Sequence, residues 1–456
     1  MQQYHAAPIS LPQSALVVEL RSLDDPQLQT WMQEQTGNTF PAWPLETWTL
    51  DSLTAAAYYF NSDLQVARAQ LQAAMAGVQT AAMKPNPTLG GAAGYESAQE
   101  SPYLFGLGFA LPIETAGKRG HRMELANHQV EAARIHVGEV AWGIRSQVRS
   151  TLLQYMVMER QAALLQRQEG TDAKTAALLQ QQLQAGEVAW PAVNNARIQL
   201  DHTRIALRTA EGQRETDRAA VAAAVGVPAS ALEGKKLRWK DFDHPQPASA
   251  VDLAQMEHQA LVNRLDVRRA LALYEAAQSQ LQLEIARQYP DLVLGPGYNY
   301  EEGANFLAFQ PSLVLPIRNQ NQGPIAQATA QRKAAAEALI AVQQHALSAC
   351  DQALARYRAA STALAEIDNT LLQLQTRQQT SARASLQAGE TERLSLQQLQ
   401  LQTVATQQMR LQALAAVQTA WSDLEDVLQR PLIDPATLDF PTASVPATPG
   451  RNAFQR

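Results

Sequence analysis

Hydrophobic and polar positions follow two different periods along this chain. Over residues 103–111, large apolar side chains occupy every second position, and mostly small side chains lie between them. A period of two is typical of a β-strand whose two faces differ. Residues 89–97 precede this stretch, and residues 292–300 and 307–315 repeat the alternation. We therefore expect two β-hairpins.

Around the hairpins, the apolar positions recur at helical spacing. We expect one helix over residues 50–83, which ends before Pro85, and another over residues 117–184, where there is no proline. At 1.5 Å per residue, the second helix is about 100 Å long. The Ala-Gly-Glu sequence at 185–187 predicts a turn, after which a return helix reaches about Val225. The return helices carry apolar seams at coiled-coil spacing, namely Val193, Ala196, Leu200, Thr203 and Leu207 in one, and Leu414, Val417, Trp421, Leu424 and Leu428 in the other.

Five short sequences recur in one order about 203 residues further along the chain. They are Asn61–Ala69 with Asn263–Ala270, Gly94-Tyr95 with Gly297-Tyr298, Leu111-Pro112-Ile113 with Leu315-Pro316-Ile317, Leu183–Glu187 with Leu386–Glu390, and Pro228 with Pro431. Each match is weak alone, but together they predict an internal duplication. Each copy reads helix, hairpin, helix, turn, helix.

The predicted fold class is mainly α with a small β part. Long antiparallel coiled-coil helices accompany two β-hairpins, which give four strands per chain. We expect five segments: an N-terminal extension (1–47), a first repeat (48–230), a linker (231–249), a second repeat (250–433) and a flexible C-terminal tail (434–456).

Composition narrows the function classes. The net charge of −6 gives no electrostatic reason to expect nucleic-acid binding, which draws on a basic face. A single cysteine, Cys350, excludes an internal disulfide and a cysteine-rich zinc site, and it is expected to be a buried thiol. No apolar run approaches the roughly 18 residues of a membrane-spanning helix. Residues 1–10 do not read as a signal peptide, so the chain is either cytosolic or lacks a removed export signal.

The predicted hairpins have the length of membrane strands. About ten residues cross a bilayer when a strand is tilted, and the small or polar face of each strand suits a wet lumen. The side chains expected to face lipid are Tyr103, Phe105, Leu107, Phe109, Leu111, Leu307, Phe309, Leu313 and Leu315. Four strands cannot close a barrel, and open edges cannot face lipid. Three chains would supply twelve strands, and their helices would form a second, helical barrel.

The residues at the end of each predicted hairpin, and those that follow it, resemble the motifs of a known protein family. Leu111-Pro112-Ile113-Glu114 is followed by Gly117-Lys118-Arg119, and Leu315-Pro316-Ile317 is followed by the sequence Arg-Asn-Gln-Asn-Gln-Gly at 318–323. Over about residues 50–433 the chain resembles the TolC-like outer-membrane factors of tripartite efflux systems, and these motifs resemble the heavy-metal (cation) efflux branch. Many members carry a lipid on an N-terminal cysteine, and no cysteine precedes Cys350 here.

The resemblance implies a fold and a function. It implies a homotrimer, a 12-stranded β-barrel joined to an α-helical barrel, in the bacterial outer membrane and extending into the periplasm. It further implies a passive duct without catalysis or cofactor, which works with a periplasmic adaptor and an inner-membrane resistance-nodulation-division pump. The two helix turns would be the periplasmic tips that contact the adaptor and close the tube. Carried over by position, the tip residues are Gly186, Glu187, Val188, Gly389, Glu390, Thr391, Arg393, Leu394 and Ser395.

Other candidate residues favour no separate chemistry. His121, His128 and His136 share a helical stripe, but successive members are about 10 Å apart, too far to hold one ion, so no metal site is predicted. Trp142 and Trp190, together with Trp421 of the second seam, are expected to pack between helices. No nucleophile elbow, HExxH motif or catalytic carboxylate pair occurs, so an enzyme is not expected.

Three functions remain to be weighed. The first is an outer-membrane efflux duct whose cargo is heavy-metal cations or, alternatively, drugs and other organic solutes. The second is a soluble coiled-coil scaffold, which does not account for two bilayer-length hairpins followed by the same Leu-Pro-Ile sequence. The third, a metal-handling enzyme or storage protein, requires clustered ligands that the sequence lacks.

Overall fold

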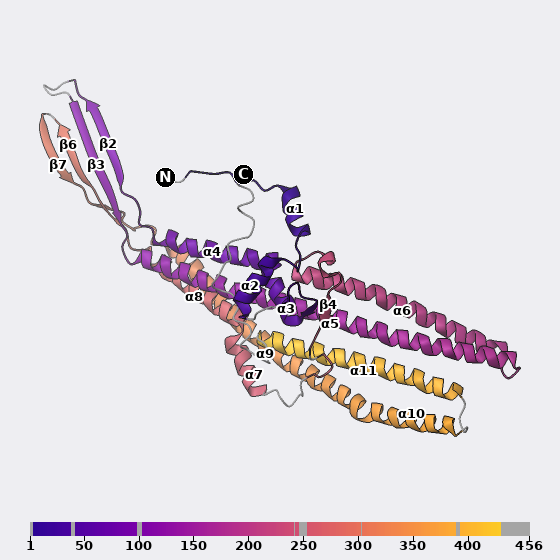
Figure 1. Cartoon of the computed structure of the whole chain (residues 1–456). Helices are drawn as coiled ribbons and strands as arrows, with labels where there is room; N and C mark the ends of the chain where they lie inside the picture. Colours follow the sequence, from indigo (N-terminus) through magenta and orange to yellow (C-terminus); the bar gives the residue numbers. More distant parts are fainter. Residues whose placement is uncertain are drawn as a thin grey trace. The chain divides into compact units, whose positions relative to one another are not determined.

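The computed structural model describes residues 3–37, 42–97, 103–240, 242–245, 253–301, 303–388 and 393–429. The chain divides into two compact units. Figure 1 labels the helices and strands of the chain. Unit 1 comprises Met1–Gln65, Val140–Leu261 and Ala346–Ser444, and unit 2 comprises Val66–Glu139, Val262–His345 and Val445–Arg456. None of the described helices is both long enough and apolar enough to cross a membrane.

Unit 1 holds the two long helical hairpins. The first is formed by α5 (Lys118–Gln184, of which the part from Val140 belongs here) and α6 (Trp190–Val225). The second is formed by the later part of α9 (Gln322–Glu366), a π-helix (Ile367–Leu371), α10 (Leu372–Gln387) and α11 (Arg393–Leu428). The predicted seams are the packed faces: the five seam residues of α11 are buried, and those of α6 are buried or half-buried.

The π-helix accounts for an irregularity in the duplication. Before it, the two long helices match at a spacing of 202 residues, because Leu152 and Tyr155 correspond to Leu354 and Tyr357, and all four side chains are buried. After it, the spacing is 203, as in the matching Leu-Gln-Ala-Gly-Glu sequences. A π-turn accommodates one additional residue within a continuous helix. The π-helix therefore absorbs a single-residue insertion in the second copy.

The smaller elements of unit 1 include a two-stranded parallel sheet. Strand β1 (Thr47–Thr49) pairs in parallel with β4 (Lys236–Arg238), and the Trp48 side chain between them is fully buried. The Arg21 guanidinium donates to the Gly226 carbonyl at 2.9 Å. The remaining elements are α1 (Leu11–Glu19), α2 (Pro26–Thr36), α3 (Leu50–Phe60), a 3-10 turn (Ala229–Leu232) and α7 (Leu253–Asn263, which reaches into unit 2).

The helix predicted over residues 50–83 is in fact two helices, α3 and α4 (Ser62–Ala82). Asn61 separates them with an extended backbone (φ −66°, ψ 124°). Its side-chain oxygen accepts a hydrogen bond from the Asp63 amide at 2.9 Å. Asparagine is a strong helix N-cap, so a new helix begins here instead of the old one continuing.

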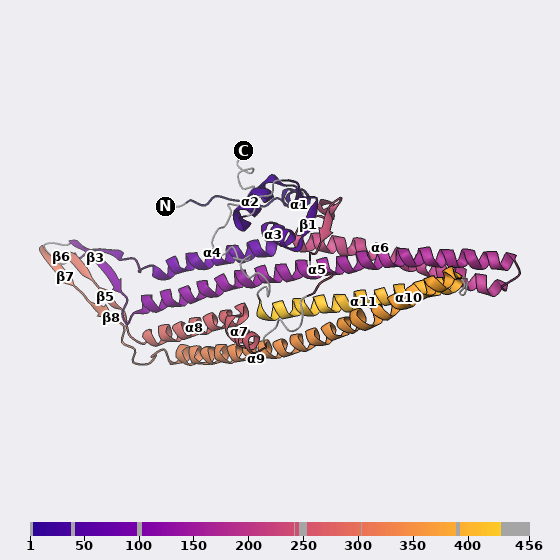
Figure 2. The same cartoon turned by 60° about the horizontal axis from the view of Figure 1, so that its bottom comes forward.

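Unit 2 contains a sheet and four helices that follow one another in space. The sheet order is β2 (Thr88–Tyr95), β3 (Tyr103–Ile113), β6 (Pro296–Glu301) and β7 (Ala304–Phe309), with every neighbouring pair antiparallel. Strands β5 (Leu292–Leu294) and β8 (Ser312–Leu313) continue β6 and β7. Next to the sheet, α4, the start of α5, α8 (Leu265–Ala286) and the start of α9 lie in that order (Figure 2).

The second hairpin is interrupted where the first is not. Gly295 and residues 310–311 fall outside the strands, yet the register on either side is the same, since Leu294 pairs with Leu111 and Gly297 with Gly108. The Gln310 amide still donates to the Gly295 carbonyl at 2.9 Å. A Cβ at position 295 would lie 2.6 Å from the Gln310 carbonyl oxygen, so only glycine fits this close approach.

Candidate functional site

The sheet presents one strongly apolar face. Tyr103, Phe105, Leu107 and Phe109 of β3 alternate with smaller residues, and their side chains are 53–56% exposed. The neighbouring strands continue this face in register, because Leu107 pairs with Tyr298, which pairs with Leu307. Large side chains left in the open on a continuous sheet face need a nonaqueous partner. The sheet therefore has the surface of a lipid-facing or protein-facing wall.

The sequence-predicted strand residues largely come together on this face. Leu111 continues it at the end of β3, and Phe309 pairs with Pro296. Leu313 lies on β8 and pairs with Leu292, whereas Leu315 follows β8 outside any strand. The opposite face is lined mainly by small or polar side chains. The Asn299 side chain covers Gly106. A Cβ at position 106 would lie 2.7 Å from the Asn299 side-chain oxygen.

Both edges of the sheet are open as far as the described residues go. Each edge strand has one partner: β2 pairs only with β3 among the described residues, and β7 only with β6. The outer backbone N–H and C=O groups of both edges therefore lack strand partners in the described part of the chain. Open edges are tolerated in water but not in hydrocarbon, where each unsatisfied group costs several kcal/mol.

The segment that follows the first β-hairpin is bound to the second repeat by a cluster of polar contacts. The Lys118 Nζ donates to Asp291 Oδ1 and to the Tyr289 carbonyl, each at 2.7 Å. The Thr115 amide also donates to Asp291 Oδ1, at 3.0 Å. Partial burial by itself raises the pKa of the Asp291 carboxyl, but the hydrogen bonds from Lys118 and Thr115 outweigh it, and the pKa lies below its ordinary value.

The basic residues of this exit also close the end of α4. The Arg119 Nε donates to the Ala82 carbonyl at 2.7 Å. The Arg122 guanidinium pairs with the Glu114 carboxylate and reaches the Ala81 and Met83 carbonyls. Cations at a helix C-terminus satisfy its free carbonyls and its dipole. The Gly-Lys-Arg sequence thus connects the sheet to the helices.

The first helix turn has a well-defined cap. Gly186 adopts the left-handed conformation (φ 76°), the Glu187 amide donates to the Gln182 carbonyl at 2.8 Å, and the Gly186 amide donates to the Leu183 carbonyl at 3.1 Å. This pair of bonds is a Schellman motif, which ends a helix at a glycine. The Glu187 side chain is exposed, and Val188 is half-buried.

The second turn is described only on one side. Gly389, Glu390 and Thr391 lie outside the described residues. Arg393 begins α11, and the Leu394 and Ser395 side chains are half-buried.

One prediction about the tryptophans is wrong. Trp142 and Trp421 are buried, as expected, but Trp190 is 62% exposed at the start of α6. Pro191 follows it in the first turn of that helix, close to the glycine turn. An indole held in solvent by a rigid turn is a residue type that protein interfaces favour.

The histidine stripe is paired with carboxylates. The Nδ1 atoms of His121, His128 and His136 lie 3.3, 3.1 and 3.0 Å from Glu124, Glu275 and Glu139 respectively. Among the described residues no three His, Cys, Asp or Glu side chains gather as a metal site requires. Glu139 also accepts from Arg269 Nε at 2.9 Å, so it joins α5 to α8.

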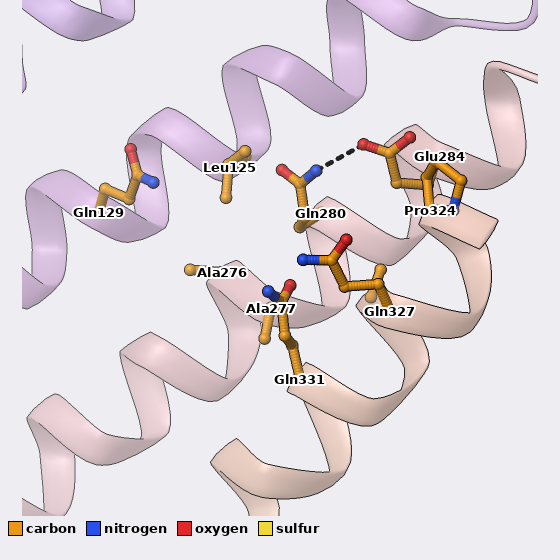
Figure 3. A pocket seen from close by; sticks show the side chains of 10 residues that line it. Leu125, Gln129, Ala276, Ala277, Gln280, Glu284, Pro324, Gln327 and Gln331 are labelled. Carbon is orange, nitrogen blue, oxygen red and sulfur yellow. Dashed lines mark hydrogen bonds between the residues drawn. The ribbon is translucent and has the colours of Figure 1, made fainter. Parts of the chain in front are cut away.

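A polar groove of about 440 Å³ lies between α5, α8 and α9 of unit 2 (Figure 3). The amide side chains of Gln129, Gln280, Gln327 and Gln331 line it. The buried Glu284 carboxylate at one end is already engaged, because it accepts from Gln280 at 2.7 Å, Arg287 at 2.5 Å and Asn321 at 2.9 Å. The groove therefore offers neutral amides and no free charged ligand to a cation.

A buried ionic network in unit 1 has no counterpart among the sequence predictions. The Glu425 carboxylate of α11 accepts from both Arg145 and Arg149 of α5, and all three side chains are at most 10% exposed. Asp426 accepts from the Trp142 indole at 2.9 Å and from the Ser146 hydroxyl at 2.6 Å. Burial raises the pKa of the Asp426 carboxyl. The partners are about 280 residues apart in sequence, so no local motif signals the network.

Long helical hairpins joined to a sheet with an exposed apolar face and open edges define a class of proteins that build a duct wall. Comparison with known proteins gives the family. The family described as "Outer membrane efflux protein" matches residues 56–227 and 257–428, about three quarters of the chain. The chain belongs to this family of outer-membrane efflux channels, which is a family of ducts and not of enzymes.

Individual relatives agree with this assignment. The chain is 26% identical over 317 residues to the cobalt-zinc-cadmium resistance protein CzcC of Cupriavidus metallidurans, covering 68% of this chain and 73% of that protein. Its fold resembles the crystal structure of CusC, with a TM-score of 0.67 at 19% identity over 83% and 91% of the two chains. It also resembles the outer membrane protein VceC of Vibrio cholerae, with a TM-score of 0.65 at 17% identity over 83% and 96%. The predicted mainly α, duplicated channel fold is confirmed.

Proposed function

We propose that three copies of this chain form a continuous outer-membrane duct that carries divalent heavy-metal cations out of the periplasm. The sheet is the observation that carries the proposal. Its β3 strand has 11 residues, one face is apolar and exposed, and both edges are open. Lipid on the apolar face and neighbouring copies at the edges would satisfy all of these groups.

Strand counting and the family resemblance support three copies. One chain supplies four lines of strands, so three chains give twelve, within the range of membrane barrels. The same symmetry would arrange the long helices of the three copies in a ring, which we propose as a helical tube. The segment boundaries given above, at 47, 230, 249 and 433, remain our proposal for where the repeated units begin and end.

The tips are proposed to receive a periplasmic adaptor, which couples the duct to an inner-membrane pump of the resistance-nodulation-division class. The exposed Trp190 beside the Gly186 turn supports this role for the first tip. Glu187 is exposed there, and by the duplication we assign the same role to Gly389, Glu390, Thr391, Arg393, Leu394 and Ser395 of the second tip.

Two observations support heavy-metal cations as the cargo. One is the pair of hairpin-exit motifs, and the other is the similarity to CzcC, a cobalt-zinc-cadmium resistance protein. Organic solutes are the second candidate, since the groove in unit 2 is lined by neutral amides. A soluble coiled-coil scaffold is disfavoured, because it gives the exposed sheet face and its two edges no partner.

Deletion of the gene in the native host tests the cargo. Cells without the protein are expected to lose tolerance to cobalt, zinc and cadmium salts, and the wild-type gene is expected to restore it. The matched control is a panel of organic drugs at inhibitory doses. Unchanged metal tolerance combined with increased drug sensitivity would assign the duct to organic solutes instead.

A further inference from the structure

A cavity of about 420 Å³ lies within unit 1, between α5 of the first helical hairpin and α10 and α11 of the second. Its rim carries charge, in contrast to the amide-lined groove of unit 2. Arg160 and Arg167 of α5 and Arg410 of α11 line it, together with Asp243 from the segment that joins the two repeats. We call this cavity the arginine pocket. Its volume is in the range of sites that bind small molecules.

The floor of the arginine pocket is apolar. Leu411 and Leu414 of α11 are buried there, and Leu164 of α5 and Leu372 of α10 are half-buried. An apolar floor with a few polar groups at its rim is the usual composition of a ligand site. The pocket therefore suits a molecule with an apolar body and a polar end.

Two of the three arginines are already paired with carboxylates. The Arg160 guanidinium binds the Asp243 carboxylate, and its Cζ lies 4.4 Å from the centre of the Phe242 ring. The Arg410 guanidinium binds both oxygens of Asp368, with Nε to Oδ1 at 2.5 Å and Nη2 to Oδ2 at 3.1 Å. These pairs fix the two guanidinium groups in position and neutralise their charges.

The third arginine leaves a positive charge at the rim. Arg167 is exposed, and its side chain forms no hydrogen bond or ion pair with any residue that the structure describes. The half-buried Gln407 of α11 adds an amide to the lining. Three arginines and two aspartates leave one net positive charge. A guanidinium group matches the planar or branched oxygens of a carboxylate, sulfonate or phosphate, so an acidic group is the polar end that fits.

The duplication shows that the helices do not need these arginines in order to pack. At the spacing of 202 residues, Arg160 corresponds to Thr362, and at the spacing of 203, Arg410 corresponds to Leu207. The position that matches Arg167 falls within the π-helix, where its counterpart is uncharged. Equivalent positions of the same fold are therefore neutral. The cluster of charges is specific to this pocket and is not part of the repeated packing pattern.

Two irregular features of the chain meet at the arginine pocket. The π-helix supplies Asp368, and Leu372 of the floor follows it directly. The segment between the repeats, which has no duplicate, supplies Asp243. Single π-turns within long helices occur frequently at functional sites. The places where the two repeats differ are thus the places that build this pocket.

We infer that the arginine pocket binds an amphipathic organic anion with a single negative charge. Its acidic group would contact Arg167 and Gln407, and its apolar body would lie on the leucine floor. Because both helical hairpins of unit 1 line the pocket, a bound molecule joins them and stabilises their contact. This inference goes beyond the proposed duct and uses neither the number of copies nor the cargo.

Binding of naphthalenesulfonate to the full-length protein in lipid nanodiscs tests the inference. Equilibrium dialysis against empty nanodiscs measures the bound amount and corrects for uptake by lipid. We expect one site per chain and a rise in the melting temperature with probe concentration. The uncharged naphthalenesulfonamide has the same ring system, and it should bind at least about tenfold more weakly because it cannot pair with a guanidinium.

Three variants locate the site. Arg167→Gln removes the free charge and should weaken binding of naphthalenesulfonate about tenfold. Ala163→Trp places an indole at an exposed position of the lining, so it should block the pocket without disturbing the core. Arg208→Gln is the matched control, because Arg208 is an arginine of unit 1 that is 83% exposed outside the pocket, and it should bind as the wild type does.

Each contrary result would overturn the inference. Absence of binding would do so, and so would equal binding of the sulfonamide, which would indicate apolar adsorption only. Unchanged binding by Arg167→Gln or by Ala163→Trp would place the probe elsewhere. Equal weakening by Arg208→Gln would assign the effect to general surface charge. A chain that proves monomeric in membranes but binds the probe as expected would overturn the proposed duct and leave the arginine pocket intact.

Discussion

At the scale of single residues, the interior of the first helical hairpin contains a carboxyl that forms no ion pair with any residue that the structure describes. Asp172 is 2% exposed, and its Oδ2 accepts from the Thr203 hydroxyl at 2.7 Å. The second copy has Gln375 and Thr406 at the matching positions, and Gln375 Nε2 lies 2.5 Å from the Thr406 hydroxyl. Both repeats therefore have a polar pair at this level of the coiled coil, but only the first repeat has an ionisable residue in it.

Replacement of Asp172 by glutamine is expected to stabilise the protein at neutral pH. Burial raises the pKa of the Asp172 carboxyl, so the folded state holds its proton more tightly than the unfolded state does. Stability from this group is present below the unfolded pKa of about 3.8 and is lost as the pH rises through the folded pKa. Asp172→Gln should raise the free energy of unfolding by on the order of 1 kcal/mol at pH 7.

Thermal melts of the detergent-solubilised protein at pH 7 and pH 4 measure this effect. The gain should shrink at pH 4, and Glu187→Gln, which alters an exposed carboxyl, should have no effect at either pH. A gain that is equal at both pH values would show that the charge of Asp172 is not its cause.

The buried ionic network gives a second residue-scale prediction. Glu425→Gln removes the carboxylate that accepts from the buried Arg145 and Arg149, and loss of one partner of a buried pair costs about 3–5 kcal/mol. The melting temperature should fall markedly. Glu211→Gln, which breaks the exposed pair with Arg208, should change it little, because such pairs contribute less than about 1 kcal/mol. Similar small changes in both variants would contradict a stabilising role for this network.

At the scale of elements, the two faces of β3 and its neighbours should respond differently to charge. Leu107→Arg places a cation on the exposed apolar face, where an arginine at the bilayer midplane costs about 2–4 kcal/mol. Asn299→Arg places one on the opposite, polar face and should be tolerated. We expect Leu107→Arg to reduce the amount of protein in the outer-membrane fraction, measured by fractionation and immunoblotting.

The reverse result for these two variants, with Asn299→Arg lost from the membrane and Leu107→Arg retained, would mean that the apolar face points inward. That outcome would leave the sheet intact but would reverse the proposed orientation of its faces.

At the scale of the whole molecule, the proposed transport depends on contacts outside the sheet. Trp190 lies at the turn of the first helical hairpin, whereas the apolar strands belong to the other unit. Trp190→Ala is therefore expected to lower metal tolerance in the native host severalfold without changing expression or the oligomer, because it removes a large residue of the proposed contact and no core packing.

Trp142→Ala is the informative comparison for this prediction. It removes a buried indole and a hydrogen bond to Asp426, so it should lower both stability and tolerance. If Trp190→Ala leaves metal tolerance unchanged, the exposed indole has no part in partner contact.

Much of the molecule could be predicted from the sequence, because its strongest signals are local and repeated. The period-two stretch at 103–111 and the long proline-free stretch before Gly186 each specify one element, and the duplication supports each reading a second time. The break at Asn61 was also visible as an N-cap residue, but helical periodicity on both sides concealed it.

The remaining features depend on residues that the sequence does not bring together. The contact of Arg145 and Arg149 with Glu425 and the pairing of β1 with β4 join segments roughly 190 to 280 residues apart. The exposure of Trp190 depends on where the residue lies in the tertiary structure. The sequence of its helix shows only that this position is apolar. Such features require the three-dimensional arrangement, which local propensity cannot supply.

The π-helix at Ile367–Leu371 has a consequence for how the two halves of this gene can diverge. One added residue would rotate everything beyond it by about 100° around the helix axis if the α-helix simply continued. The π-helix holds the added residue within one wide turn and so cancels that rotation. Beyond it, the helix of the second half has the same orientation around its axis as the helix of the first half. Drift in length between the halves is therefore tolerated wherever one wide turn can form, and quasi-symmetry outlasts the sequence identity that created it.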